Sequence, residues 1–120
     1  MTVQNLDKSI DFYTRILNME LISIKSMKAL KFGPQRINLH VAGLERKPNA
    51  HKACVGSLDL CFIVDTPITT IIKNLTNQNI TIEFGPVTVI GAQGEMESIF
   101  IRDPDKNLVE LSFYEEQNSY

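Results

Sequence analysis

Apolar residues recur at helical spacing in two stretches of the chain. In residues 5–18 they fall three or four positions apart, at Leu6, Ile10, Tyr13 and Leu17, with Phe12 and Ile16 widening the stripe. Such spacing predicts an amphipathic helix, and Asn5 suits the N-cap position because its side chain can accept a backbone N–H. Residues 67–77 predict a second helix, with Pro67 in its first turn.

The remaining apolar residues form short runs that are typical of strands. After the first helix the runs cover residues 20–26, 29–32 and 36–41. After residue 58 they cover residues 59–64, 81–84, 97–102 and 108–113. The polar segment 44–56 predicts a linker. The glycine-rich segment 85–94 lacks the GxxxxGK[ST] pattern of a phosphate loop, so a mobile lid is expected there.

This order repeats, and each half reads as βαβββ. We therefore predict an α+β fold in one domain over residues 1–120, with module 1 at 1–43, the linker at 44–56 and module 2 at 57–120. The second module opens on a full strand, whereas the first has only Met1, Thr2 and Val3 in that place. Aligning Val3 with Val64 puts the counterpart of Asp59 about three residues before Met1, so the first strand is expected to be truncated.

Polar residues gather on one face of several predicted strands. Side chains alternate between faces along a strand. Arg36, Asn38 and His40 therefore share one face of strand 36–41, opposite three apolar residues. Asp59 and Cys61 share a face of strand 59–64, and in strand 108–113 Glu110 shares its face with Leu108 and Ser112. If the sheet curls, these faces line a concave pocket for a small molecule.

Composition excludes several classes of partner. The net charge of −2 gives no electrostatic reason to expect nucleic acid or anionic lipid as a partner. No apolar run is long enough to cross a bilayer, and no signal-peptide pattern opens the chain. Cys54 and Cys61 do not make a disulfide framework, so a reduced, cytoplasmic protein is expected.

Four segments together resemble the vicinal oxygen chelate superfamily, which includes glyoxalase I, bleomycin-resistance proteins and extradiol dioxygenases. They read NLDKSIDFYTRILNME, FGPQRINLH, GSLDLCFIV and RDPDKNLVELSFY, and the DPDxNxxE pattern in the last is the most specific. FGPQRINLH and GSLDLCFI look closest to the glyoxalase domain-containing protein 5 branch. The resemblance implies paired βαβββ modules forming a half-open, barrel-like sheet around a divalent metal.

The resemblance also implies where metal ligands would lie. Glu110 matches the glutamate of the family's last strand, and Asp59 falls where many members have a histidine. Asn38 falls where glyoxalase I has a glutamate, and the ligand of the first strand is absent from the chain as given. His40, on the same face as Asn38, is the candidate to complete the set. Arg36, Asn38 and Cys61 are expected to contact the substrate.

The function implied is a metal-dependent lyase or isomerase of the lactoylglutathione lyase type. It would act on a hemithioacetal, with Glu110 moving a proton between carbons. An oxygen-rich ligand set favours Mn²⁺, Ni²⁺, Mg²⁺ or Fe²⁺, with Zn²⁺ also considered. The alternative is a metal-free protein that binds a small molecule, as bleomycin-resistance proteins do. The short chain argues against a dioxygenase. Many relatives pair as homodimers, and a homodimer is expected here.

Structural roles for the same residues stay open at this point. Glu110 could face water on an edge strand, and Asp59 could cap the turn at residues 56–57. His40 could be a hydrogen-bonded histidine that only lines the barrel. Cys61 is expected to be a small buried group rather than a nucleophile, because no activating partner is evident.

Overall fold

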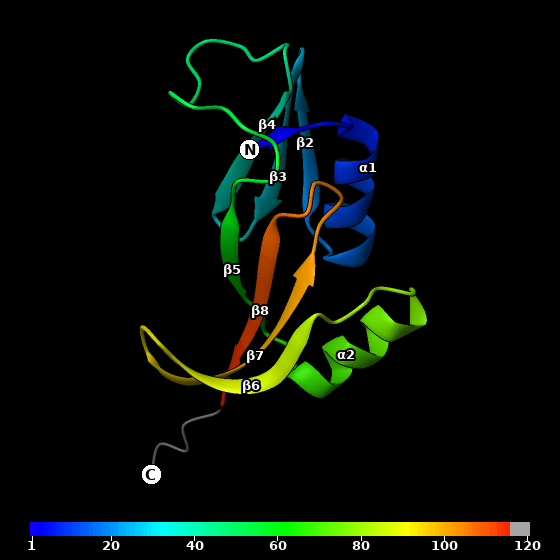
Figure 1. Cartoon of the computed structure of the whole chain (residues 1–120), viewed down its shortest axis with the longest axis vertical. Coiled ribbons are helices and arrows are strands. Elements are labelled where there is room, and N and C mark those ends of the chain that lie inside the picture. Colours follow the sequence, from blue (N-terminus) through cyan, green and yellow to red (C-terminus); the bar gives the residue numbers. More distant parts are fainter. Residues whose placement is uncertain (116–120) are drawn as a thin grey trace. The chain divides into compact units, whose positions relative to one another are not determined.

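The fold consists of two open four-stranded sheets, and a helical segment connects the first strand of each sheet to the next strand in the sequence (Figure 1). The computed structural model describes residues 1–115. Their contacts form two units: unit 1 comprises residues 1–58 and 103–107, and unit 2 comprises residues 59–102 and the chain from Leu108 onward. In each unit the order of elements is βαβββ, so the predicted repeat and the α+β fold class are confirmed.

Unit 1 is built from the first half of the chain. Its elements are β1 (Thr2–Val3), α1 (Leu6–Asp11), the π-helix η1 (Phe12–Ile16), β2 (Glu20–Ile24), β3 (Met27–Phe32) and β4 (Gln35–Val41). The strand order is β1-β4-β3-β2. The β1 strand runs parallel to β4, and the other neighbours are antiparallel. The α1 helix contacts β4.

Unit 2 repeats this plan with a longer first strand. Its elements are β5 (Asp59–Ile63), α2 (Ile68–Asn77), β6 (Phe84–Gly91), β7 (Gly94–Arg102) and β8 (Leu108–Tyr114). The strand order is β5-β8-β7-β6, with β5 parallel to β8. The α2 helix contacts β7 and β8. Because β8 lies between β5 and β7, it is a central strand of its sheet.

The registers of the two sheets agree with the predicted alignment of the halves. Thr2 pairs with His40 in unit 1, and Ile63 pairs with Ser112 in unit 2. The alignment that matches Asn38 with Glu110 also matches His40 with Ser112. It therefore matches Thr2 with Ile63 and Val3 with Val64, as the sequence predicts.

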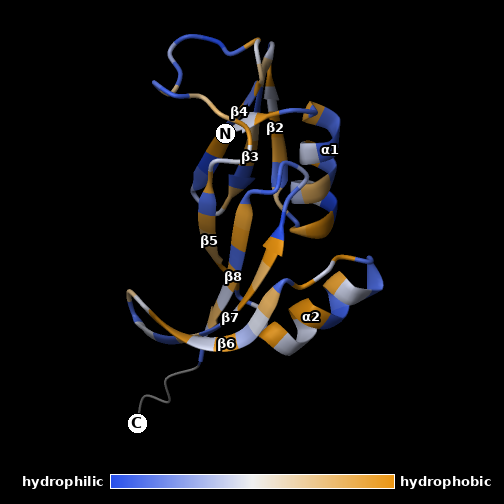
Figure 2. Cartoon of the chain, in the orientation of Figure 1, coloured by the Kyte–Doolittle hydropathy of each residue, from blue (hydrophilic) through white to orange (hydrophobic). Residues whose placement is uncertain are grey.

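Each sheet buries one apolar face, and in unit 2 that face packs on α2. Leu75 of α2 is 1% exposed, while Ile99, Ile101 and Val109 of the sheet are fully buried. Burial of one such side chain contributes roughly 1.5–3 kcal/mol to folding. Hydrophobic and hydrophilic residues alternate around the turns of α2 (Figure 2). The amphipathic pattern in residues 67–77 thus places this helix on its sheet.

The first predicted helix is present but changes type part-way. The Asn5 side chain accepts a hydrogen bond of 3.0 Å from the Lys8 N–H, which confirms the predicted N-cap. After Asp11 the helix widens into η1, which ends at Ile16. Apolar periodicity specifies the buried face of a helix but not its hydrogen-bond spacing, so the sequence did not predict the π-helix.

The prediction of a mobile lid over residues 85–94 is wrong. This segment forms most of β6 and the turn to β7, with Val87 opposite Ser98 and Val89 opposite Met96. A register shift between Phe84 and Val87 accommodates the residues between them. The alternating valines are a strand pattern that the flanking glycines obscured.

The DPD turn of residues 103–107 belongs to unit 1, although β7 and β8 on either side of it belong to unit 2. Asp103 is 4% exposed, and its carboxylate accepts four hydrogen bonds. The donors are the Tyr13 hydroxyl at 2.6 Å, the Asn107 side-chain amide at 2.8 Å, and the backbone N–H groups of Asp105 and Asn107 at 2.9 Å each. The buried carboxylate is therefore satisfied by donors from both the helix and the turn.

Candidate functional site

The polar face of β4 forms as the sequence predicts. Arg36 and Asn38 are exposed and His40 is partly buried, whereas Leu39 on the other face is buried. Successive side chains of β4 point to opposite faces of the sheet, so the polar side chains at every second position share one face. Three predicted site residues therefore lie on one surface of unit 1.

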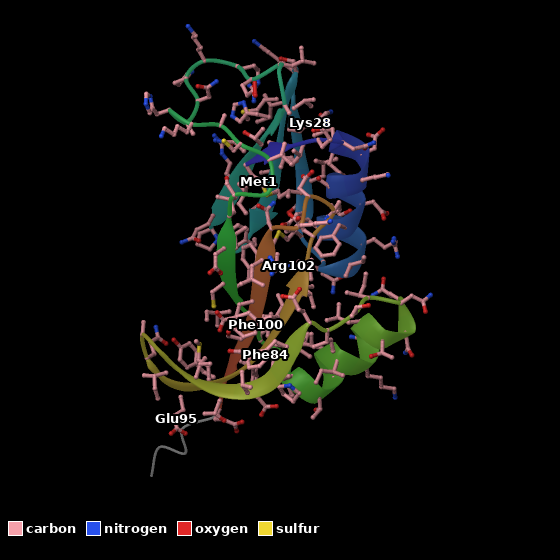
Figure 3. The ribbon with its side chains drawn as sticks, in the orientation of Figure 1. Met1, Lys28, Phe84, Glu95, Phe100 and Arg102 are labelled. Carbon is pink, nitrogen blue, oxygen red and sulfur yellow. The ribbon has the colours of Figure 1, made fainter. Side chains whose placement is uncertain are left out.

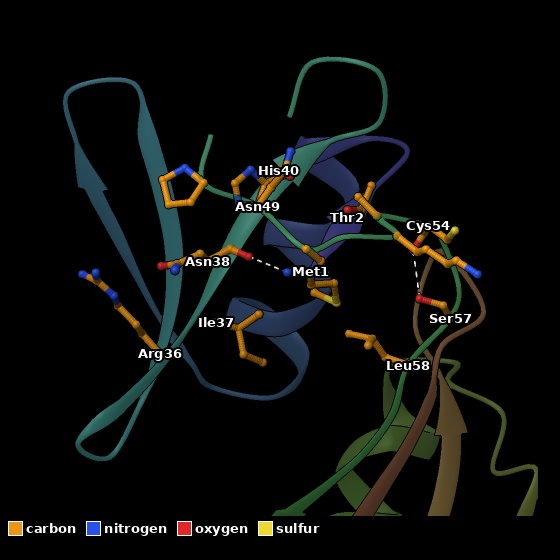
Figure 4. A pocket seen from close by; sticks show the side chains of 14 residues that line it. Met1, Thr2, Arg36, Ile37, Asn38, His40, Asn49, Cys54, Ser57 and Leu58 are labelled. Atoms are coloured by element: carbon orange, nitrogen blue, oxygen red, sulfur yellow. Dashed lines mark hydrogen bonds between the residues drawn. The ribbon is translucent and has the colours of Figure 1, made fainter. Parts of the chain in front are cut away.

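This face lines a pocket of about 480 Å³ in unit 1 (Figure 4). From β4 the lining includes Arg36, Asn38 and His40, and from the linker it includes Asn49 and Lys52. The volume lies in the range of pockets that hold small organic molecules. The pocket thus unites the predicted polar face with a linker segment for which the sequence predicted no definite role.

The pocket runs along an edge of β4 that β1 covers only in part. The short β1 strand pairs with His40 and Val41 alone. The Met1 amine donates to the Asn38 carbonyl at 2.6 Å, as the dashed line in Figure 4 shows. Arg36 and Asn38 extend from β4 on the side opposite Ile37 (Figure 4). The side chains of Arg36 and Asn38 are therefore exposed along the pocket.

His40 is suited to act as a neutral hydrogen-bond donor in this pocket. Its Nδ1 accepts a long hydrogen bond of 3.4 Å from the Arg46 N–H. Burial lowers the pKa of His40 below its ordinary value, and the charge of Arg46 acts in the same direction. With Nδ1 as acceptor, the neutral ring carries its proton on Nε2. His40 is thus hydrogen-bonded within the protein, as the structural alternative expected. The same hydrogen bond leaves its Nε2–H available to a ligand.

In unit 2 a second polar surface holds the predicted carboxylates. Cys61 of β5 lies directly opposite Glu110 of β8, and Asp59 lies opposite Leu108. Register partners share a face, so Asp59, Cys61 and Glu110 project to the same side of the sheet. The two carboxylates thus project from adjacent strands to the same face of the sheet, as the alternation of side chains predicts.

Buried hydroxyl groups fix the Glu110 carboxylate. The Ser112 hydroxyl donates to Glu110 Oε2 at 3.0 Å, and it lies 2.7 Å from the hydroxyl of Ser98. Both serines are fully buried. The Cys61 sulfur lies 3.4 Å from the Ser112 hydroxyl. These contacts restrict the rotamers of Glu110. The strand order makes β8 a central strand, so the alternative of an edge strand is wrong.

Cys61 differs from the sequence prediction, because it is exposed rather than buried. Partial burial nevertheless raises the pKa of its thiol, and the charges of Glu110 and Asp59 act in the same direction. A thiol with a raised pKa is a poor nucleophile. The Asp59 side chain is exposed and forms no hydrogen bond with the residues that the structure describes, so the alternative role of Asp59 as a cap of the turn at residues 56–57 is not observed.

An aromatic pair extends the polar surface of unit 2. Phe100 lies opposite Glu110, and the rings of Phe84 and Phe100 are 5.8 Å apart and tilted by 52° (Figure 3). Phe84 is 59% exposed, which is unusual for so large an apolar side chain. The sequence reasoning missed this pair because it ended a strand at Phe84 and assigned the following residues to a loop, so Phe84 had no predicted partner on β7.

The described residues do not complete a metal site. Within residues 1–115 no group of three or more His, Cys, Asp or Glu side chains is placed to hold a metal ion. Asp59 and Glu110 supply two carboxylates, while catalytic metal centres commonly use three protein ligands. His40, the predicted third ligand, belongs to unit 1. Unit 2 by itself thus offers two carboxylate ligands, and the three-residue set with His40 stays a prediction.

Comparison with known proteins identifies the family. The sequence profile described as "Glyoxalase/Bleomycin resistance protein/Dioxygenase superfamily" matches residues 1–111. The chain belongs to this superfamily. Its relatives within the superfamily include Virulence protein STM3117 of Salmonella typhimurium, 44% identical over 115 residues, which are 95% of this chain and 80% of that protein.

Two further comparisons support the assignment. Glyoxalase domain-containing protein RDO1 of Mycosarcoma maydis is 45% identical over 117 residues, which are 97% of this chain and 66% of that protein. The crystal structure of STM3117 matches with a TM-score of 0.92, covering 96% of this chain and 92% of the other. The crystal structure of lactoylglutathione lyase from Agrobacterium tumefaciens is 21% identical with a TM-score of 0.71 over 94% of this chain and 88% of its own, and it shares the fold alone.

Among the described residues, no helix combines the length and apolar character needed to span a membrane. The superfamily assignment and the two polar surfaces therefore direct attention to small-molecule ligands.

Proposed function

We propose that this chain binds a small polar organic molecule in the pocket of unit 1, without a resident metal. The observation that carries the proposal is the pocket of about 480 Å³ along β4, lined by Arg36, Asn38 and His40. Three candidate residues that the sequence singled out face this one cavity. Membership of a superfamily that includes bleomycin-resistance proteins supports the same function.

Chemical-shift mapping tests this proposal directly. A set of small polar molecules, including neutral amides and sugars, is titrated into the ¹⁵N-labelled chain. Ligands that bind should move the backbone signals of residues 36–40 and 49–54. Asn38→Leu, which removes amide hydrogen bonds from the pocket, should weaken binding about tenfold. If signals move only elsewhere, or if Asn38→Leu changes nothing, the proposal fails.

A second candidate is the metal-dependent lyase that acts on a hemithioacetal. The observation in its favour is the placement of Asp59 and Glu110 on one face of adjacent strands, with Glu110 oriented by Ser112. Two carboxylates so placed offer oxygen atoms to a hard cation and a base for proton transfer. The incomplete donor set ranks this candidate second.

Lactoyl-thioester formation from the methylglyoxal–glutathione adduct tests the lyase candidate. The assay is run with added Mn²⁺, Ni²⁺, Mg²⁺, Fe²⁺ and Zn²⁺ in turn. Glu110→Gln should lower the rate by at least ~100-fold, the usual contribution of a general base. The control is Glu95→Gln in the turn region of the hairpin (Figure 3), which should leave the rate unchanged. No turnover with any metal would remove this candidate. The predicted homodimer and cytoplasmic location remain predictions.

A further inference from the structure

The pocket of unit 1 carries positive charge that its own walls do not balance. Its lining includes Arg36 of β4 and Lys52 of the linker, and it includes no Asp or Glu. We propose that the pocket recognises an anionic group, a carboxylate or a phosphate, on its ligand. This inference rests on the proposed binding function and names the chemical class of the ligand.

The two cations are available for a ligand. Both are exposed, and neither the Arg36 nor the Lys52 side chain forms a hydrogen bond or ion pair with another of the described residues. In contrast, Arg15 is bound to Asp11 and Arg102 to Glu83, each at 2.9 Å. The fork of an arginine matches a carboxylate or phosphate through two parallel hydrogen bonds. Arg36 is therefore the principal candidate for contact with the anion.

Neutral donors accompany the cations. The side-chain amides of Asn38 and Asn49 line the same pocket, as does His40. The neutral His40 ring donates through Nε2, because its Nδ1 accepts from Arg46. Anion sites commonly combine a cation with several neutral donors, since charge-assisted hydrogen bonds are the strong ones. The lining has this composition.

The carboxylate of Glu45, the acidic residue that follows β4, is hydrogen-bonded outside the pocket lining. Glu45 follows β4, and its charge acts on His40, but Glu45 is not part of the pocket lining. Both oxygens of its carboxylate accept the Gly43 N–H, at 2.9 and 3.0 Å. This backbone hydrogen bond lowers the pKa of Glu45 and holds its carboxylate in the turn after β4. The charge of the pocket itself thus remains positive.

Titration with defined anions tests the inference. Inorganic phosphate and succinate are added separately to the ¹⁵N-labelled chain at constant ionic strength, with sodium chloride as the reference. Both anions, or one of them, should move the signals of residues 36–40 and 49–54 in a saturable way. Arg36→Gln and Lys52→Gln should each weaken this binding about tenfold. Lys8→Gln, a matched change on the exposed face of α1, should leave the affinity unchanged.

The outcomes separate this inference from the proposed function. If neutral molecules bind in the pocket but neither anion moves its signals, the anion inference is overturned and the binding function stands. If Lys8→Gln weakens anion binding as much as Arg36→Gln, the attraction is a diffuse effect of net charge, and the inference is again overturned. If no molecule, neutral or anionic, moves the pocket signals, both proposals fall.

Discussion

Tyr13 and Asp103 form a short, buried hydrogen bond between distant parts of the sequence. The Tyr13 hydroxyl donates to Asp103 at 2.6 Å across 90 positions of sequence, and Tyr13 is fully buried. Burial raises the pKa of Tyr13 far above its ordinary value, and the hydrogen bond to Asp103 adds to the shift. The hydroxyl is thus held neutral, as a donor to a buried carboxylate.

Removing this hydroxyl should destabilise the chain. Tyr13→Phe keeps the ring but leaves Asp103 with one donor fewer, so the free energy of unfolding should fall by about 1–3 kcal/mol. Chemical denaturation measures the change. The matched control is Tyr114→Phe, because the Tyr114 hydroxyl accepts only an exposed hydrogen bond from Gln93. Equal losses in the two variants would contradict the prediction.

The same pair predicts a pH dependence. Tyr13 ionises in the unfolded chain near pH 10.0 but resists ionisation in the folded chain, because its pKa is raised. The stabilisation is therefore complete below pH 10.0 and declines as pH rises above it. The stability difference between the natural chain and Tyr13→Phe should shrink from about pH 9 to about pH 11. A difference that grows over this range would show the opposite linkage.

Strand alternation predicted correctly which candidate residues share a face of their sheet. It placed Arg36, Asn38 and His40 on one face, and Asp59 with Cys61 on another, because side-chain direction in a strand follows from the sequence alone. It could not place Lys52 or Asn49 in the pocket, because the path of an irregular linker depends on tertiary contacts.

At the scale of elements, the linker is fixed by a close backbone approach to the DPD turn. Gly56 has φ of +72°, and a Cβ atom built there would lie 2.6 Å from the Asp105 carbonyl oxygen. The Asn107 side chain also accepts the Leu58 N–H at 2.9 Å. The end of the linker therefore follows the turn, and glycine is required at residue 56 for both conformation and space.

Two glycine substitutions separate these requirements. Gly43→Ala also meets a positive φ, of +83°, but has nothing within 4 Å of the added methyl group, so it should cost about 1–2 kcal/mol. Gly56→Ala should cost roughly 1–3 kcal/mol more, because the backbone must also move. Denaturant unfolding of both variants measures the difference. Similar losses of unfolding free energy in the two variants would show that the backbone at Asp105 moves away from the added methyl group with little cost.

The sequence predicted least well the elements whose structure depends on tertiary contacts rather than on apolar periodicity. Residues 85–94, which form most of β6, were assigned to a loop because glycines flank the alternating valines. The pairing of β6 with β7, Val87 opposite Ser98 and Val89 opposite Met96, decides the outcome. Intrinsic preference is a weak guide to strands, since cross-strand neighbours supply the stabilisation.

At the scale of the whole molecule, the fold was predictable mainly because the βαβββ order of elements repeats in the sequence. Recognising βαβββ twice predicted the fold, both sheet orders follow from it, and the matched registers of β1 and β5 agree with it. The repeat does not predict a complete metal centre in the same way. A shared centre needs ligands at fixed separations, and strand alternation gives only the face on which each ligand lies.

The DPD turn belongs to unit 1 while its flanking strands belong to unit 2, so amide hydrogen exchange should differ between the turn and the strands. The N–H groups of Asp105 and Asn107 are protected by Asp103, within unit 1. Their exchange should report local opening of unit 1, whereas Ile101 and Val109 should report unit 2. Tyr13→Phe should accordingly speed exchange at the first two amides far more than at the last two. Equal acceleration at all four would mean that the molecule opens as a single cooperative body.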